Sequence, residues 1–363
     1  MTTAQPATAG SPPTLPSEPF GQTSDGHAAT LYTLENERLR VHITDFGGRM
    51  VRIETPDRHG HQGDVLLGFD NVRTYITAGG AFGALLGRSA NRIAGASITV
   101  DGQKYQLSQN NGATTLHGGA VGFDKVFWTV IAAEAGPTPR LVLNHVSADG
   151  DQGFPGEVSV EASYQLNEDS LWLEFQAQTS KPTVINLSAH PYFNLAGAAS
   201  GDVLGHEVTI ASDAFLPTDA KQIPTGEIRP VDGTLFEFRQ PALLGSRIRQ
   251  ADEQLFYGLG FDHCFVLGMD VPANPRLAVR VRDPASGRVL EVYTDQPGVQ
   301  LYTGNKLNGS FAGHGGVIYR QSAGFALEPQ GLPDAPHHSN FPSTSLRPGE
   351  SYRRVIRYRF TAA

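Results

Sequence analysis

Short strand-like runs follow one another from about residue 28 to the C-terminus, and this succession constrains the fold more than any other feature. Runs such as LRVHIT, EVSVEASYQL and RVLEVYTD alternate apolar and polar residues or are rich in β-branched and aromatic side chains. Turns separate them at short intervals, because 41 Gly and 24 Pro are scattered along the 363 residues. The pattern predicts an all-β protein built from antiparallel strands.

Two segments allow a more detailed prediction. ASITVDGQKYQL, residues 96–107, reads as a hairpin in which Asp101-Gly102 forms a type I′ turn. PALLGSRIRQADEQL, residues 241–255, is the best helical candidate, and it is short. Helices therefore contribute little to the predicted fold.

The chain divides into a short tail and one large domain. Residues 1–18 are rich in Pro, Thr, Ser and Ala, so they bury too little apolar surface to order themselves, and we expect a flexible tail. Residues 19–363 show no internal repeat, no low-complexity linker and no break in composition. They are predicted to form a single domain.

The net charge and the cysteine count indicate which partners and which cellular compartment to expect. The net charge of −8 argues against a nucleic-acid partner, and no apolar run reaches the ~20 residues of a membrane span. No basic segment precedes an apolar stretch at the N-terminus, so no secretory signal is visible. The lone Cys264 excludes an intrachain disulfide and suits a reducing compartment. We expect a cytoplasmic protein, either monomer or dimer.

The stretch NLSAHPYFNLAG, residues 186–197, has the most unusual pattern in the chain. Read as a strand, it has an apolar face for a core and an opposite face on which every side chain is polar. Pro191 removes a backbone donor beside His190, which indicates a strand edge or bulge next to a site. A half-exposed strand with an incidental histidine is the alternative. The polar face consists of Asn186, Ser188, His190, Tyr192 and Asn194.

Five further stretches carry polar side chains where a plain strand would not place them. A strict strand would put Asn91 and Arg92 on opposite faces, so a turn or bulge is needed if both serve one site. Glu328 ends an apolar run before a proline, and a carboxylate at the mouth of an apolar sheet is a candidate base. Each stretch alone has an ordinary structural explanation, such as an ion pair, a turn or a solvent-facing amide. The stretches are GRSANRI (87–93), LHGG (116–119), GFDHC (260–264), QPGVQLYTGN (296–305) and GFALEPQ (324–330).

Metal and nucleotide chemistry are not indicated by spacing. The histidines show no HxH or HExxH pattern, and one cysteine cannot form a CxxC pair. A glycine-rich phosphate loop is also missing from the sequence. We therefore predict neither a metal nor a cofactor.

Taken together, the stretches resemble the aldose 1-epimerase (galactose mutarotase) family in order and spacing, and the resemblance covers nearly all of the chain after the tail. In this family the fold is a β-supersandwich of stacked antiparallel sheets with a sugar cleft. The resemblance implies that His190 and Glu328 are the catalytic acid and base. The residues that it implies for holding the sugar are Asn91, Arg92, His117, Asp262 and Gln300.

The activity implied by the resemblance is isomerisation of free aldohexoses such as D-galactose and D-glucose between their α and β anomers. Our hypothesis is that Glu328 removes the proton of the C1 hydroxyl while His190 protonates the ring oxygen. Ring opening, rotation about C1–C2 and reclosure then need no metal or nucleotide. A bell-shaped pH dependence should follow.

Three other functions remain open at this stage. A glycoside hydrolase would need two carboxylates, and Glu328 with Asp262 is the candidate pair. A non-catalytic carbohydrate-binding protein would rely on exposed aromatic platforms. An enzyme for hexose 6-phosphates would need a cluster of cations, for which only Arg88 and Arg92 stand near the motifs. The sequence leaves the preferred sugar undetermined.

Overall fold

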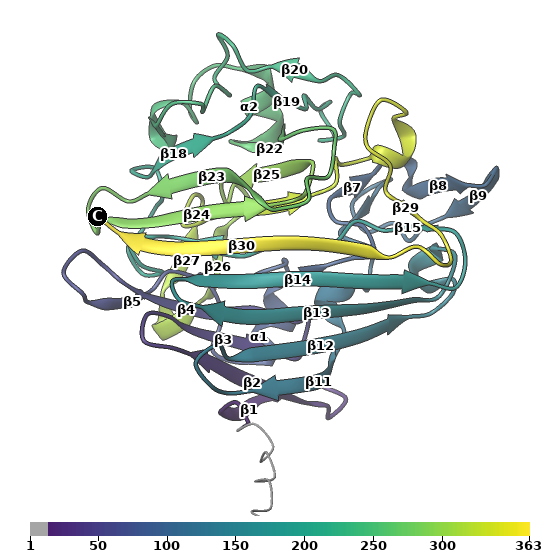
Figure 1. Ribbon diagram of the computed structural model, residues 1–363. Helices are drawn as coiled ribbons and strands as arrows, with labels where there is room; N and C mark the ends of the chain where they lie inside the picture. The colour runs from purple at the N-terminus through teal and green to yellow at the C-terminus, as the bar shows by residue number, and fades with distance from the viewer. Residues whose placement is uncertain (1–13) are drawn as a thin grey trace, which may run out of the picture.

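A nine-stranded antiparallel sheet crosses the whole molecule in the computed structural model, which describes residues 14–363 (Figure 1). Along β13 buried and exposed residues alternate, so one face of this sheet is covered and the other meets water. In spatial order its strands are β11 (Thr129–Glu134), β12 (Arg140–Ser147), β13 (Val158–Asn167), β14 (Ser170–Thr179), β30 (Tyr352–Ala362), β24 (Arg288–Thr294), β23 (Arg276–Arg282), β18 (Glu207–Ile210) and β21 (Ala242–Leu243).

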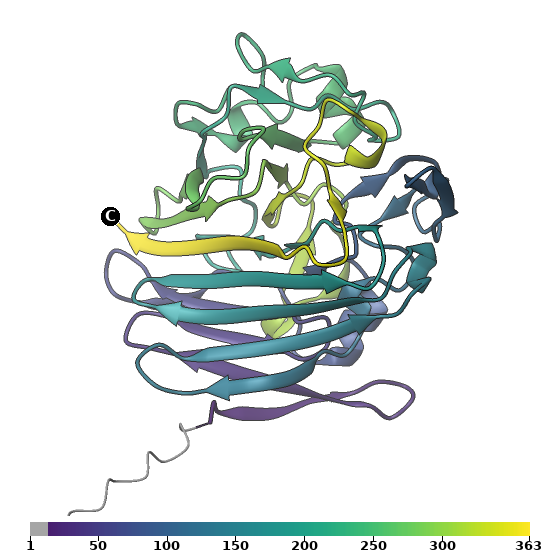
Figure 2. The same cartoon turned by 45° about the vertical axis from the view of Figure 1, so that its right-hand side comes forward.

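A five-stranded sheet packs on the β11–β14 half of the large sheet, where it lies behind those strands in Figure 2. Apolar side chains such as Val41 and Ile53 join Leu143 and Val160 of the large sheet in one core cluster. Its strands, in order, are β1 (Ser17–Gln22), β2 (Ala28–Glu35), β3 (Arg40–Thr44), β4 (Met50–Pro56) and β5 (Gln62–Asp64).

A six-stranded sheet contributes to the same core cluster through Phe265 and Leu327, together with Leu290 and Ile356 of the large sheet. The stacked antiparallel sheets confirm the predicted β-supersandwich. The strands of this sheet, in order, are β17 (Tyr192–Phe193), β28 (Phe325–Gln330), β25 (Gly298–Tyr302), β22 (Asp262–Val266), β19 (Ala214–Phe215) and β20 (Arg229–Pro230).

Short strand pairs and two short helices complete the described part of the chain. None of its helices is long and apolar enough to cross a bilayer. The pairs are β6 (Leu85–Leu86) with β16 (Ser188–Ala189), β7 (Arg92–Ile93) with β10 (Thr115–Leu116), β8 (Ser97–Val100) with β9 (Gln103–Gln106), β15 (Thr183–Val184) with β29 (Ser345–Leu346), and β26 (Asn308–Ala312) with β27 (Ile318–Arg320). The helices are α1 (Val72–Ala78) and α2 (Glu253–Gly258).

Local predictions succeed where turn chemistry decides the structure. Asp101 and Gly102 have φ of 50° and 80°, the two positive values that a type I′ turn requires, and β8 pairs with β9 as predicted. The helix predicted over 241–255 is largely wrong, because only its last residues enter α2. That helix starts late because the Asp252 side chain caps it, accepting from two backbone N–H groups.

The folded part of the chain begins earlier than residue 19. Leu15 is buried in the large core cluster, and β1 begins at Ser17. Residues 14–18 thus contribute to the fold although we assigned them to the tail. The rest of the predicted tail, residues 1–13, lies outside the described residues.

Candidate active site

The stretch 186–197 runs through the centre of the molecule, but not as one strand. It forms β16, which pairs with β6, and β17, which pairs with β28, and the break falls at His190-Pro191 as the proline suggested. The alternative of a half-exposed strand is wrong, because residues 186–195 are all buried. Most of the polar side chains serve the structure: the Ser188 hydroxyl, for example, donates to the carbonyl of Pro329 at 2.7 Å.

Glu328 lies in β28, the second strand of the six-stranded sheet, between β17 and β25. The strand register places Glu328 opposite Gln300, which in turn lies opposite Cys264. The proline after Glu328 does not end the strand, because β28 continues through Pro329 to Gln330. A proline can stay in a strand where its missing N–H is not needed by the ladder. The carboxyl group is thus held by regular sheet rather than by a loop.

His190 and Glu328 meet in this buried region. The His190 Nε2 lies 3.3 Å from Glu328 Oε1, and their side chains are 7% and 3% exposed. Glu328 Oε2 and His190 Nδ1 have no hydrogen-bond partner within residues 14–363. Each group therefore keeps one polar atom that a ligand can engage.

Burial moves the pKa values of this pair in opposite directions. Desolvation, helped by the negative charge of Asp262, raises the pKa of Glu328 well above its usual value. Desolvation also lowers the pKa of His190 to about 4. At pH values between the pKa of His190 and the raised pKa of Glu328, the pair as a whole holds one proton. At a separation of 3.3 Å that proton can reside on either group.

His117 lies edge-on to His190, with ring centroids 5.5 Å apart. The backbone N–H of Asn91 donates to His117 Nδ1 at 3.1 Å. Burial and then the neighbouring His190 lower the pKa of His117 well below its usual value, so the ring is neutral and carries its hydrogen on Nε2. Asn91 and His117 both have positive φ, 59° and 50°, which confirms the turn predicted beside Arg92. His117 is thus a fixed donor at the site.

Three side chains here could together hold a metal ion. His117, His190 and Glu328 each offer a ligand atom, and these atoms all lie within 4.8 Å of one another. The contact of Asn91 with His117 Nδ1 leaves Nε2 protonated, however, and a protonated nitrogen cannot ligate. The arrangement favours hydrogen bonding to a substrate.

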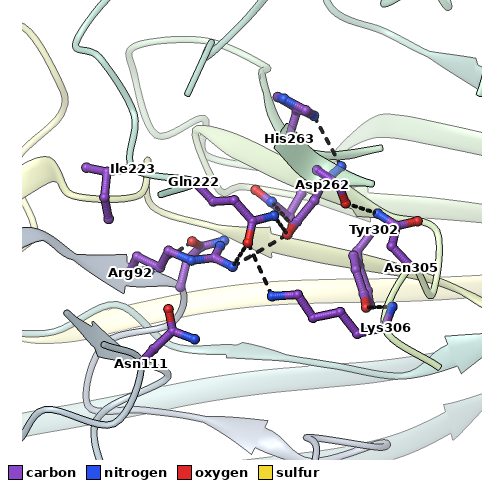
Figure 3. A network of polar contacts seen from close by, with 12 residues as sticks. Arg92, Asn111, Gln222, Ile223, Asp262, His263, Tyr302, Asn305 and Lys306 are labelled. Carbon is purple, nitrogen blue, oxygen red and sulfur yellow. Dashed lines mark hydrogen bonds and ion pairs between the residues drawn. The ribbon is translucent and has the colours of Figure 1, made fainter. Parts of the chain in front are cut away.

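A second group of polar residues surrounds Asp262 (Figure 3). Asp262 Oδ1 accepts from Gln300 Nε2 and Oδ2 from Gln222 Nε2, both at 2.7 Å. Arg92 Nη2 lies 3.6 Å from Asp262 Oδ2 and donates to Gln222 Oε1 at 2.8 Å. Arg92 Nε and Gln300 Oε1 are buried without a partner in the described chain. A polyhydroxylated ligand could satisfy both.

The structure brings all seven predicted site residues into one region and adds two that sequence reasoning missed. Gln222 and Lys306 join the network, with Lys306 Nζ 3.2 Å from Gln222 Oε1. A glutamine and a lysine are ordinary surface residues, and the only signal was that Lys306 directly follows the QPGVQLYTGN stretch. Arg88, by contrast, is not part of the site, because its guanidinium donates to the carbonyls of Pro155 and Ala148.

The outline of the surface agrees only in part with this location. A groove of about 260 Å³ borders the site and is lined by Phe82, Tyr192, Tyr302 and Lys306 among others. The larger hollow, about 990 Å³, is lined by the 36–39 turn and the last strand and contains none of the site residues. We place the site by its chemistry, since the unpartnered buried polar atoms lie beside the smaller groove.

The chain is similar to known proteins over nearly its whole length. A family model described as aldose 1-epimerase matches residues 30–359. The galactose mutarotase of Bos taurus is 45% identical over 92% of this chain and 94% of its own length. The aldose 1-epimerase of Escherichia coli is 36% identical over 93% and 97%. Among solved structures, an aldose epimerase homologue from C. elegans superposes with a TM-score of 0.84 at 30% identity, covering 93% of this chain and 100% of that one.

Proposed function

The chain belongs to the aldose 1-epimerase family, and we propose that Glu328 and His190 carry the proton transfers of its reaction. The protein is a mutarotase, an isomerase that interconverts the α and β anomers of free aldoses. The observation that supports these two roles is the buried 3.3 Å contact between the carboxyl and imidazole groups, each with a free polar atom. One proton held by this pair is what the reaction has to move.

Ring opening follows from the form of the pair in which Glu328 is ionised and His190 is protonated. Glu328 takes the proton of the C1 hydroxyl, the bond between C1 and the ring oxygen breaks, and His190 gives its proton to that oxygen. The product is the open-chain aldehyde, and rotation about C1–C2 exposes its other face. For closure, His190 takes the proton back from the C5 hydroxyl and Glu328 returns one to the aldehyde oxygen. Protons and charges balance over the cycle.

The surrounding residues would orient the sugar and stabilise the charge that develops. His117 donates from Nε2 and would stabilise the ring oxygen as its bond to C1 breaks, while Arg92 would bind a sugar hydroxyl through its unpartnered Nε. Asp262 and Gln300 would hold sugar hydroxyls. Asn91 supports both groups, since its backbone N–H fixes His117 and its side-chain oxygen accepts from the backbone N–H of Arg92 at 2.8 Å.

The arrangement of the carboxylates disfavours hydrolysis of a glycosidic bond. A hydrolase uses two carboxyl groups that both act on the scissile bond. Here Asp262 is engaged through both oxygens with amide donors, from Gln222 and Gln300. This leaves Glu328 with an imidazole partner, as proton exchange at a hemiacetal requires.

The proposal is tested by polarimetry on freshly dissolved α-D-glucose and α-D-galactose. Glu328→Gln keeps the shape of the side chain and removes the base, so we expect kcat to fall by about 10²–10⁴-fold. Glu161→Gln, on the exposed face of β13, is the matched control and should retain the wild-type rate. An unchanged rate in Glu328→Gln would refute the assignment of the base, and the ratio of wild-type rates would show which sugar is preferred.

We also propose a cytoplasmic location, consistent with the single cysteine. Cys264 lies buried in β22, so its thiol is packed in the fold. Fractionation of the native host with compartment markers would test this placement. Recovery with periplasmic or secreted markers would contradict it.

A further inference from the structure

Nothing in the sequence marks Gln222 as a site residue. Its carboxamide lies between the acidic Asp262 and the two cations Arg92 and Lys306 (Figure 3). The amide nitrogen donates to Asp262 Oδ2 at 2.7 Å, and the amide oxygen accepts from Arg92 at 2.8 Å and Lys306 at 3.2 Å. One neutral group therefore satisfies three charged ones.

The separation of Arg92 and Asp262 shows the effect of this insertion. Their nearest atoms are 3.6 Å apart, whereas a charge-assisted hydrogen bond between such groups is about 2.7–2.9 Å long. Both side chains are buried, so little water is present to screen their attraction. Without the amide, the guanidinium and the carboxylate would close into a direct ion pair. The Arg92 donors and the Asp262 lone pairs that face the site would then bind each other and would no longer be available to a ligand.

The loop holds Gln222 ready for this role. Its backbone has φ of 63°, in a turn organised by Asp219. The Asp219 side chain accepts from the backbone N–H groups of Lys221 and Ile223, and its carbonyl accepts from the N–H of Gln222. Partial desolvation and the charge of Arg92 disfavour the charged form of Lys306 and lower its pKa, and the Gln222 oxygen offsets this by accepting from Nζ. The side chain of Gln222 is thus placed by local structure.

We propose that Gln222 is a positioning residue for the sugar, which keeps Arg92 and Asp262 apart so that both can bind hydroxyl groups. This inference rests on the proposed binding roles of Arg92 and Asp262. Because Gln222 acts on binding groups and not on the Glu328–His190 pair, its loss weakens sugar binding and spares the chemical step. The effect appears in KM and leaves kcat nearly unchanged.

The test measures kcat and KM for α-D-galactose in Gln222→Leu and Gln222→Glu. Leucine removes the donor and the acceptor at similar volume, and we expect KM to rise about tenfold with kcat within about twofold of wild type. Glutamate keeps the acceptors for the cations but sets a second carboxylate against Asp262, so KM should rise further. Lys221→Ala, the exposed neighbour, is the control and should match wild type.

The variant Asp262→Asn tests the proposed binding role of Asp262 separately from the positioning role of Gln222. If Asp262→Asn leaves KM unchanged, the proposed binding role of Asp262 fails. If Asp262→Asn raises KM but Gln222→Leu leaves it within about twofold of wild type, the inference about Gln222 alone is overturned. In the double variant the Gln222→Leu penalty should shrink, because its target is already altered. A full, additive penalty would also overturn the positioning role.

Discussion

Two strands of this molecule, β13 and β28, carry glutamates in opposite circumstances. In β13, buried and exposed residues alternate, and Glu161 faces water on the outside of the nine-stranded sheet. In β28, every residue is buried, and Glu328 faces the covered site where its partner is His190. The outer carboxylate keeps its hydration, whereas the inner one has lost it.

The comparison shows that the layer covering a sheet, more than the residue type, decides the properties of a carboxylate. Desolvation is the first cause of the raised pKa of Glu328. Two arginines of one motif are both buried and differ in their partners. Arg88 is buried with backbone carbonyls as partners, while Arg92 is buried with Nε unpartnered beside Asp262. The sequence stretch is the same, but one arginine supports the fold and the other faces the site.

The largest effect should come from a comparison of His190, which lies between β16 and β17, with a histidine of the nine-stranded sheet. His190→Asn removes the proposed acid, and we expect kcat to fall by about 10²–10⁴-fold, as for loss of one proton-transfer group. His145→Asn, in β12 of the nine-stranded sheet, should leave kcat close to wild type. Polarimetric progress curves at matched enzyme concentration measure both. An equal loss of kcat in the two variants would contradict the proposed role of His190.

A smaller effect should distinguish Arg92 from Arg88. Arg92→Met removes donors to the sugar, so KM should rise by about 10–100-fold, the value of one or two charged hydrogen bonds. Arg88→Met leaves buried carbonyls unpaired, which destabilises by about 1–3 kcal/mol for each group. Its KM should be that of wild type, with a lower Tm in thermal unfolding. A raised KM in Arg88→Met with no change in Tm would contradict the division.

The sequence was sufficient for features set by local chemistry. Alternating runs gave the sheets, and Asp101-Gly102 gave its hairpin, because a type I′ turn is specified by its own two residues. The motif stretches contain all seven predicted site residues, which the structure brings into one region. Pattern reasoning failed where distant segments decide the outcome. The stretch 186–197 was read as one strand, yet it forms β16 and β17, which pair with the distant strands β6 and β28.

Residues of the network around Asp262 show the same limit. No property of a glutamine at 222 or a lysine at 306 distinguishes it from a solvated side chain until the fold sets it between charges. Nor could spacing alone tell Arg88 from Arg92. In each case the deciding quantity is the set of partners, which belongs to the tertiary structure.

The central claim is that burial creates a catalytic pair sharing one proton, and the pH dependence of kcat/KM tests it most directly. This quantity reports the pKa values of the free enzyme. Wild-type rates, with the uncatalysed rate subtracted at each pH and the fold checked by circular dichroism, would define both limbs.

The sign of each limb follows from the two shifts. On the acid side the pair gains a second proton, and because the pKa of His190 is lowered to about 4, the rate should stay high well below pH 6 before it falls. On the alkaline side the pair loses its last proton only above the raised pKa of Glu328, so this limb should lie well above the ordinary pKa of a glutamate. A broad bell with these limbs supports the account. An acid limb centred near 6.5, the pKa of an exposed histidine, would contradict it.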